Sequence, residues 1–330
     1  MSTGAIDSLA TPTLWLVTVG ALLVLLALDF VITRRPHEVS MREALRWSAF
    51  YIALPLAFGL FVWWRYGSAR GLEYITGYLV EKSLSVDNLF VFMLLLAAFA
   101  VPLELQQRVL LFGIVGALAL RAVFIAIGAV ALAAFDWTFL VFGLILIATA
   151  VKVVAKETGG GNVDVDALRS VRLARRFVPV TPDYQGPRML GRVDGRRALT
   201  PFALVVLAVL TTDVVFAVDS VPAVYGITGD PFLVFVTNAF ALLGLRALYF
   251  VLQGALNKLV HLDVGLAVIL AFIGVKLGLH WAHQRWEAVP EIPTLASLAV
   301  IAGVLAVTAL TSHLATRRRS REAGVASRQA

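Results

Sequence analysis

The sequence predicts an all-α protein, a polytopic membrane bundle of about nine transmembrane helices, from its composition and its long apolar runs. Of the 330 residues, 60% are hydrophobic and only 15% are charged. A soluble protein of this size needs more polar residues to cover its surface. Several apolar runs reach the ~20 residues that cross a hydrocarbon core ~30 Å thick. Because lipid provides no hydrogen-bond partners for the backbone, each run is expected to form a helix.

The apolar runs divide the chain into five parts. We expect helices at roughly 14–32, 45–64, 72–99, 109–134, 137–154, 202–226, 231–252, 262–280 and 295–314. The parts are two N-terminal transmembrane helices (1–70), a first three-helix unit (71–154), a cytoplasmic basic loop (155–200), a second three-helix unit (201–281), and a last transmembrane helix with a basic tail (282–330). The tail beyond Arg317 is polar and terminal, so we expect it to be disordered.

The distribution of Lys and Arg predicts the orientation of the chain. If the N-terminus lies outside, the inward-facing segments hold 21 basic residues, whereas the outward-facing segments hold only Arg65, Arg70 and Arg285. Cytoplasmic loops of membrane proteins carry an excess of Lys and Arg. We therefore expect a multi-pass protein of the plasma (inner) membrane, with its N-terminus outside and its C-terminus in the cytoplasm.

The loop 155–200 contributes much of the net charge of +7 through a basic run from Arg169 to Arg176. Because the basic residues lie between apolar runs, we expect them to face anionic lipid headgroups and not nucleic acid. Gly159-Gly160-Gly161 lacks the following Lys-Ser/Thr of a phosphate-binding loop, so no ATP site is expected. The loop is predicted to be a flexible linker with a basic helix that faces the membrane.

An internal repeat relates the two three-helix units. Three pairs of segments occur in the same order in both units: Glu81-Lys-Ser-Leu-Ser-Val-Asp87-Asn88 with Asp213-Val-Val-Phe-Ala-Val-Asp219-Ser220, Leu120-Arg121-Ala122 with Leu245-Arg246-Ala247, and Val151-Lys152 with Val275-Lys276. The predicted topology gives the helices at 72–99 and 202–226 opposite directions. The units therefore form an inverted repeat, an arrangement typical of secondary transporters with a site near the middle of the membrane.

Among the charged residues within the apolar spans, where an ionised side chain is costly, seven are expected to face the bundle interior. They are Glu81, Lys82, Asp87, Arg121, Asp213, Asp219 and Arg246. We interpret Arg121 and Arg246 as structural charge partners that join helices. The four acids outnumber the three bases and occupy matched positions in the repeat, so we predict that they bind a cation.

Helical geometry favours pairing of acids between the two repeats. Residues six apart on a helix lie ~9 Å apart along its axis and ~120° apart around it. We therefore expect Asp87 to approach Asp219, with Asn88 and Ser220 as neutral oxygen ligands. Pro222 removes the donor for the Val218 carbonyl, which suggests a broken helix at the site. The predicted metal-binding residues are Glu81, Asp87, Asn88, Asp213, Asp219 and Ser220.

The chemistry of these ligands indicates a hard divalent cation. All of them are oxygens, which suit Mg²⁺, Ca²⁺ or Mn²⁺, and the chain contains no cysteine. His280 and His283 are expected to be interfacial residues rather than a zinc pair. No Ser–His pair, His-rich metal site or cofactor motif is present, so we expect neither an enzyme nor a bound cofactor.

The same segments resemble the TerC/Alx family of integral membrane proteins. The resemblance covers about residues 70–280 and rests on the two acidic segments, on Asn238-Ala-Phe-Ala-Leu-Leu-Gly244-Leu-Arg246-Ala-Leu-Tyr249-Phe and on Phe272-Ile-Gly-Val-Lys276. It implies a link to tellurium resistance and manganese export, with Glu81, Asp87, Asp213 and Asp219 carrying the ion. Many members have Glu three residues before the position of Asp213, where this chain has Leu210.

We therefore expect a secondary transporter that exports a divalent cation, with Mn²⁺ indicated by the resemblance, by exchange with protons. Two alternatives remain at this point. The first alternative is a non-transporting scaffold subunit of a stress-resistance complex. The second is the same class of transporter with Ca²⁺ as its ion.

Overall fold

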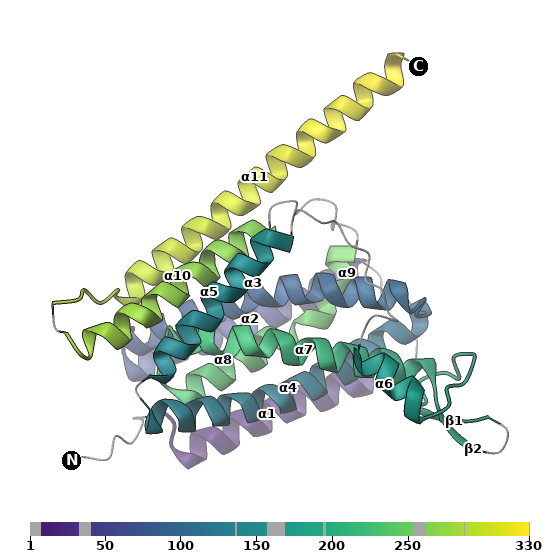
Figure 1. Cartoon of the computed structure of the whole chain (residues 1–330), viewed down its shortest axis with the longest axis horizontal. Helices are drawn as coiled ribbons and strands as arrows, with labels where there is room; N and C mark the ends of the chain where they lie inside the picture. The colour runs from purple at the N-terminus through teal and green to yellow at the C-terminus, as the bar shows by residue number, and fades with distance from the viewer. Residues whose placement is uncertain are drawn as a thin grey trace.

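The fold is an all-α polytopic membrane bundle. The computed structural model describes residues 8–32, 41–135, 137–156, 169–193, 196–253, 262–286 and 288–329. Figure 1 shows most of the long helices side by side, with α1 beginning and α11 ending on opposite sides of the molecule. The helices are α1 (Pro12–Ile32), α2 (Met41–Tyr66), α3 (Ser68–Ala98), α4 (Leu103–Ala134), α5 (Thr138–Lys156), α6 (Arg169–Phe177), α7 (Pro201–Tyr225), α8 (Pro231–Leu243), α9 (Leu245–Gln253), α10 (Leu262–His283) and α11 (Thr294–Gln329).

Eight of the nine predicted apolar spans each fall on a single helix of the bundle, and the ninth, 231–252, covers both α8 and α9. In the described part of the chain, seven segments are long and apolar enough to cross a membrane. Two of the predicted spans are not among these seven: α3, which carries the charged residues of the first repeat, and α5, whose apolar part, Thr138–Val153, is shorter. Both nevertheless pack within the bundle, α3 against α2, α7 and α8, and α5 against α10.

The predicted span 231–252 is interrupted at Gly244, which separates α8 from α9. The Lys82 ammonium of α3 lies at this interruption and donates to the Ala241 carbonyl at 3.4 Å. A Cβ atom at position 244 would lie 2.9 Å from Lys82 Nζ and 3.2 Å from the Tyr51 side chain. The lack of a side chain at Gly244 therefore lets two other helices approach the chain at the break.

The described part of the segment between the two predicted three-helix units is more ordered than a flexible linker. As predicted, a basic helix, α6, is present, but the chain then forms a hairpin of strands β1 (Leu190–Val193) and β2 (Arg196–Leu199). Tyr184 anchors the connection by donating to the Phe99 carbonyl of α3 at 2.9 Å. The preceding residues of the linker, 157–168, lie outside the described part of the chain.

Two further expectations are wrong. The helix α7 continues through Pro222 to Tyr225 and is not broken there, because the proline lies in the last turn. The C-terminal tail is helical as far as Gln329 and is not disordered. Arg, Ala, Glu and Gln favour helix and no proline interrupts the tail, so the last transmembrane helix extends into it.

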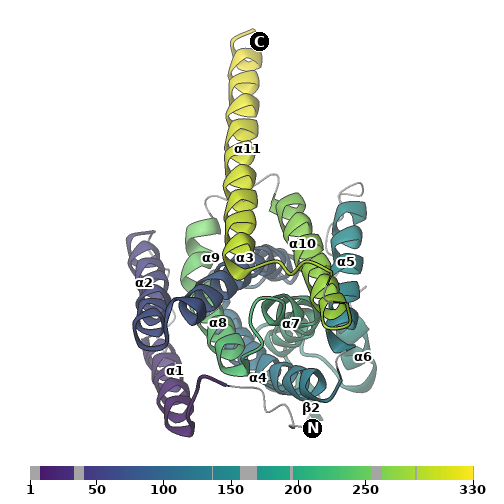
Figure 2. The same ribbon diagram turned by 90° about the vertical axis from the view of Figure 1, so that its left-hand side faces the viewer.

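The helices α3 and α7 run in opposite directions at the centre of the bundle. At one end, Thr228, just after α7, donates to Glu73 near the start of α3 at 2.8 Å. At the other end, the Tyr184 contact brings the end of α3 to the segment that precedes α7. Figure 2 shows α7 surrounded by other helices, with α1 and α2 at one edge and α5 and α10 at the other. The antiparallel pair agrees with an inverted repeat, which itself stays a prediction.

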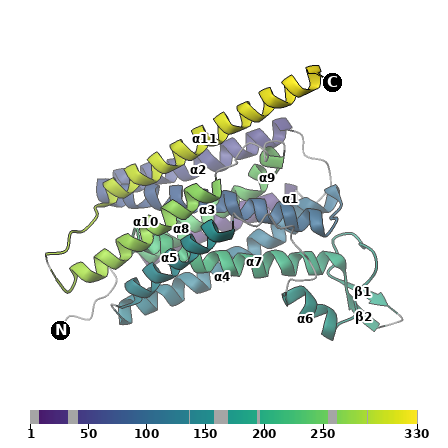
Figure 3. The ribbon, with the colours of Figure 1, turned by 45° about the horizontal axis from the view of Figure 1, so that its top comes forward.

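The helices α5 and α10 are the third helices of the two predicted units, and they pack backbone to backbone. A Cβ atom on Gly274 would lie 2.8 Å from the Gly143 carbonyl oxygen, and one on Gly143 would lie 2.7 Å from the Gly274 carbonyl oxygen. Small residues allow such close approach of helices in membranes, where dispersion contacts replace the hydrophobic effect between helices. Figure 3 shows the two helices side by side along much of their length.

Candidate cation site

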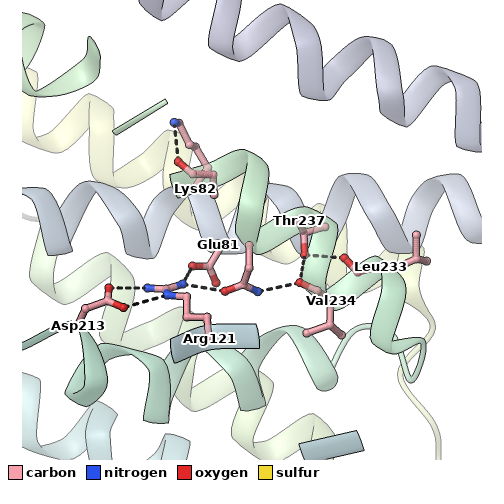
Figure 4. A network of polar contacts seen from close by, with 9 residues as sticks. Glu81, Lys82, Arg121, Asp213, Leu233, Val234 and Thr237 are labelled. Atoms are coloured by element: carbon pink, nitrogen blue, oxygen red, sulfur yellow. Dashed lines mark hydrogen bonds and ion pairs between the residues drawn. The ribbon is translucent and has the colours of Figure 1, made fainter. Parts of the chain in front are cut away.

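Arg121 of α4 lies at the centre of a buried polar cluster formed by four helices. Its guanidinium donates to Glu81 of α3, to both carboxylate oxygens of Asp213 of α7 at 3.2 and 3.4 Å, and to the Asn238 side chain of α8 at 2.7 Å. The side chains of Arg121, Glu81 and Asp213 are 0% exposed. Figure 4 shows the guanidinium between the two carboxylates. Arg121 is therefore a charge partner of an acid from each of the two predicted repeats.

The spacing of polar residues along α3 and α7 explains why they meet here. Glu81, Ser85 and Asn88 are separated by four and three residues, and this spacing places them on one face of α3. Asn88 reaches the same guanidinium: with its amide oxygen toward Arg121 it accepts at 3.2 Å, and its nitrogen donates to the Leu84 carbonyl at 3.0 Å. On α7, Asp213 and Ser220 are two turns apart and also share a face.

Several buried oxygens on these faces are not fully paired within the described residues. The hydroxyl of Ser85 has no hydrogen-bond partner there. The hydroxyl of Ser220 lies beside the Glu81 carboxylate, and it and one carboxylate oxygen of Glu81 have no other partner there. A buried polar atom without a partner costs about 1–3 kcal/mol, and each such atom therefore needs an explanation. A cation bound by these oxygens would provide one, because carboxylates and neutral oxygens are the ligands that hard divalent cations prefer.

The second pair of predicted acids is arranged differently. Asp219 of α7 accepts a hydrogen bond from Thr149 of α5 at 2.7 Å. The side chain of Asp87 lies outside the described part of the structure, so its predicted approach to Asp219 stays a prediction. Asp213 and Asp219 thus contact different helices, as their ~120° separation around α7 requires.

The other repeat arginine joins helices at a separate place. Arg246 of α9 forms a buried ion pair with Asp29 near the end of α1. Nearby, Tyr249 of α9 donates to the Gln106 side chain of α4 at 2.8 Å. The sequence analysis did not identify Asp29 as the partner, although it is the only acidic residue in the apolar run 14–32. An isolated acid in an apolar span is the signal that would have identified it.

The cluster has more carboxylates than cationic groups, so its charge is compatible with binding a cation. Two carboxylates surround one guanidinium, and with all three groups ionised the cluster has a net charge of −1. The described residues contain no group of three or more His, Asp or Glu side chains close enough to hold a metal. A cation at this place would therefore combine Glu81 and Asp213 with neutral oxygens, and Arg121 would have to move away from at least one carboxylate.

A cavity of about 560 Å³ lies at the end of the bundle where α3 begins and α7 ends. Its lining includes Glu73, Thr228, Lys276, His280 and Glu291. His280 pairs with Glu291 at 2.6 Å, and His283 contacts the Val289 carbonyl at 2.6 Å, so each histidine contacts the segment between α10 and α11. Glu73 lies eight residues before Glu81 on α3, which is ~12 Å along the helix axis.

Leu210 occupies the position where the resemblance leads us to expect a glutamate. It lies one turn before Asp213 on α7 and packs against Gly116 of α4, where an added Cβ atom would lie 2.2 Å from the leucine side chain. The chain thus has a tight apolar contact in place of a further carboxylate.

Comparison with known proteins identifies the family. The model of the integral membrane protein TerC family matches residues 66–320. An uncharacterized membrane protein of Myxococcus xanthus is 45% identical over 82% of this chain and 85% of its own length, and one of Mycobacterium tuberculosis is 42% identical over 83% and 70%. A protein of Escherichia coli, Alx, whose full name describes it as a proposed membrane-bound redox modulator, is 38% identical to this chain. The match covers 82% of this chain and 87% of that protein. No solved structure matches the chain. The chain belongs to the TerC family of integral membrane proteins.

Proposed function

We propose that the protein is a secondary transporter that exports a divalent cation, Mn²⁺ by family resemblance, through the cluster around Arg121. The observation that carries the proposal is the meeting of Glu81 and Asp213, one from each predicted repeat, in a fully buried place. One guanidinium balances the charge of only one of these two carboxylates. The second carboxylate supplies the additional negative charge, and the buried hydroxyls of Ser85 and Ser220 supply the neutral ligands that a cation requires.

In this proposal Arg121 neutralises the cluster when no metal is bound. Its guanidinium shields two carboxylates that would otherwise repel each other in a medium of low dielectric constant. An arriving divalent cation takes over Glu81 and Asp213, and the guanidinium moves toward Asn88 and Asn238, which already contact it. Protons from outside then compete with the metal for the coupled carboxylates and release it.

The energetics favour coupling to another ion. Exporting a divalent cation against an inside-negative potential requires ~4.6 kcal/mol per 100 mV, twice the value for a single charge. Asp87 and Asp219 are proposed to form a further station along the path, with Thr149 holding Asp219 in place. The cavity that contains Glu73 and Glu291 would then be the outer vestibule in the predicted orientation.

A second candidate function follows from the name of the Escherichia coli relative, which proposes a redox modulator. This chain contains no cysteine, so it has no thiol for disulfide exchange. An effect on redox balance would therefore be indirect, for example through the supply of a metal ion. A membrane scaffold remains the alternative to transport, and it predicts that the purified protein moves no cation.

The test is cation flux in vesicles that contain only the purified protein. Uptake of Mn²⁺, Ca²⁺ and Mg²⁺ would be compared with and without a pH gradient, which identifies both the ion and the coupling. Glu81→Gln, Asp87→Asn, Asp213→Asn and Asp219→Asn should each lower the flux at least about tenfold, because each removes a ligand charge. Glu104→Gln, which removes an exposed acid in the first turn of α4, is the matched control.

The outcomes separate the proposals. Loss of flux in the four variants but not in Glu104→Gln supports the site. Normal flux in both Glu81→Gln and Asp213→Asn would exclude the Arg121 cluster, and normal flux in both Asp87→Asn and Asp219→Asn would exclude the second station. No flux of any of the three metals in the unmodified protein would favour the scaffold.

A further inference from the structure

We propose that the β1–β2 hairpin and α6 form a binding site for the headgroup of an anionic phospholipid, with Arg188, Arg192 and Arg197 around its phosphate. This proposal is independent of transport. The three arginines line one pocket of about 590 Å³ together with Gln185, Leu190 and Gly191. Among the residues that the structure describes, which leave out 194 and 195, no carboxylate lines this pocket and the three arginines form no ion pair.

The register of the hairpin places two of these positive charges directly opposite each other. Arg192 of β1 and Arg197 of β2 are Cα partners, so their side chains lie on the same face of the hairpin. Like charges at directly opposite positions destabilise an antiparallel pair. An anion between the two guanidiniums would remove this repulsion, and guanidiniums bind phosphate oxygens through pairs of parallel hydrogen bonds.

Apolar side chains beside the arginines indicate that the anion belongs to a lipid. Leu190, in the same pocket, is 58% exposed, and on α6 Leu173 and Phe177 are 58% and 74% exposed. Leu173 and Phe177 are four residues apart and share one face of α6, as do Arg172 and Arg176. A helix with basic and apolar stripes is typical of the boundary between headgroups and acyl chains. A free phosphate would not require the exposed apolar residues.

The fold holds α6 and the hairpin together. Val180, three residues after α6 ends, forms a β-bridge with Leu199, which is the partner of Leu190 across the hairpin. Val171 of α6 is fully buried, and α6 packs against α7. Figures 1 and 3 show α6, β1 and β2 at the same end of the bundle, beside the start of α7.

The position of the hairpin along the chain puts this site at the membrane surface. Arg197 precedes Pro201, the first residue of the membrane-spanning helix α7, by four residues, which is at most ~14 Å of extended chain. The 25 residues of α7 extend ~37 Å, which is longer than a hydrocarbon core of ~30 Å. The first turn of α7 therefore reaches the headgroup layer, and Arg197, just before this helix in the chain, lies at the same level.

The test measures lipid binding to the full-length protein purified in detergent. Native mass spectrometry would compare phosphatidylglycerol with phosphatidylcholine and give a dissociation constant for each. Arg192→Gln/Arg197→Gln should weaken binding of phosphatidylglycerol about 25-fold, since each arginine near an anionic surface contributes about fivefold. The control Arg65→Gln/Arg285→Gln removes the same charge from segments on the opposite side in the predicted topology. Inorganic phosphate at millimolar concentration is the competitor.

A second measurement leaves the arginines intact. The chain has no cysteine, so Phe177→Cys accepts a single spin label. In nanodiscs with 30% phosphatidylglycerol the label should be more accessible to oxygen, which partitions into lipid, than to a water-soluble relaxing agent. Three results would each overturn the proposal. They are unchanged phosphatidylglycerol binding in the Arg192/Arg197 variant, binding of inorganic phosphate as tight as that of phosphatidylglycerol in the competition experiment, and a label that is fully exposed to water.

Discussion

Arg121 and Asp213, which lie 92 residues apart in the chain, are joined by two hydrogen bonds of 3.2 and 3.4 Å in a fully buried place. The same guanidinium also contacts Glu81, so a helix of the first predicted repeat is tied to one of the second. A buried charge is tolerated only when it is paired, and removing one partner exposes the others to the full desolvation cost.

Arg121→Gln should strongly destabilise the protein. It leaves Glu81 and Asp213 buried without a cation, which costs about 3–5 kcal/mol. The triple variant Glu81→Gln/Arg121→Gln/Asp213→Asn removes all three charges and should recover most of this loss while it transports nothing. The melting temperature in detergent, followed by tryptophan fluorescence, measures both effects. A single variant as stable as the unmodified protein would show that the ion pairs do not hold the helices together.

Under the proposed function, Leu210→Glu should increase the affinity of the protein for the transported cation. It adds a carboxylate one turn before Asp213 on α7, and ligand charge is a main determinant of affinity for divalent cations. The metal concentration for half-maximal uptake in vesicles should fall about tenfold. Leu210→Gln has nearly the same shape without the charge and is the control. Equal values for the Glu and Gln variants would argue against a cation at Asp213.

Gly274→Ala should destabilise the contact between α5 and α10. The added methyl group would lie 2.8 Å from the Gly143 carbonyl oxygen and from the Ile147 side chain, and overpacking of this kind costs about 1–3 kcal/mol. Gly278→Ala, one turn later on the same helix, meets nothing within 4 Å and should be neutral. The difference in melting temperature between the two alanine variants is the measurement, and equal values would contradict the close contact.

Tyr184 should ionise at unusually high pH. Burial raises the pKa of its hydroxyl to about 12, from an ordinary value near 10. Because the folded-state pKa is raised, the hydrogen bond to Phe99 contributes stability below pH ~10 and is lost as the pH rises through ~12. The difference in tyrosinate absorbance between the unmodified protein and Tyr184→Phe should titrate near 12. A midpoint near 10 would place the hydroxyl in water.

The sequence was sufficient to locate the helices because the membrane restricts the possible structures so strongly. Apolar length alone predicted each span. The charges within α3, which make that helix less apolar, were expected to face the bundle interior, and Glu81 is fully buried there. The interruption at Gly244 was missed because the run 231–252 is uniformly apolar, and the break depends on Lys82 and Tyr51 from other helices. Tertiary contacts of this kind leave no periodic signal in the chain.

The sequence predicted only part of the candidate site, because it identifies buried acids but not the tertiary contacts that they make. Buried acids in apolar spans identified Glu81 and Asp213, but their partners depend on how helices rotate against each other. Sequence spacing showed that Asp213 and Asp219 face different directions, yet it did not reveal that Asp219 meets Thr149. The hairpin was missed because its two strands of four residues each are short and rich in arginine.

The contact of Lys82 with the end of α8 links the acidic cluster to the shape of a neighbouring helix. Lys82 directly follows Glu81 on α3, and its ammonium lies at the carbonyl end of α8, where the helix dipole is negative. A rotation of α3 that carried Glu81 away from Arg121 would also withdraw this ammonium from the junction at Gly244. Under the proposed function, cation binding at Glu81 would then be coupled to a change in the angle between α8 and α9. The coupling would pass through the consecutive residues Glu81 and Lys82.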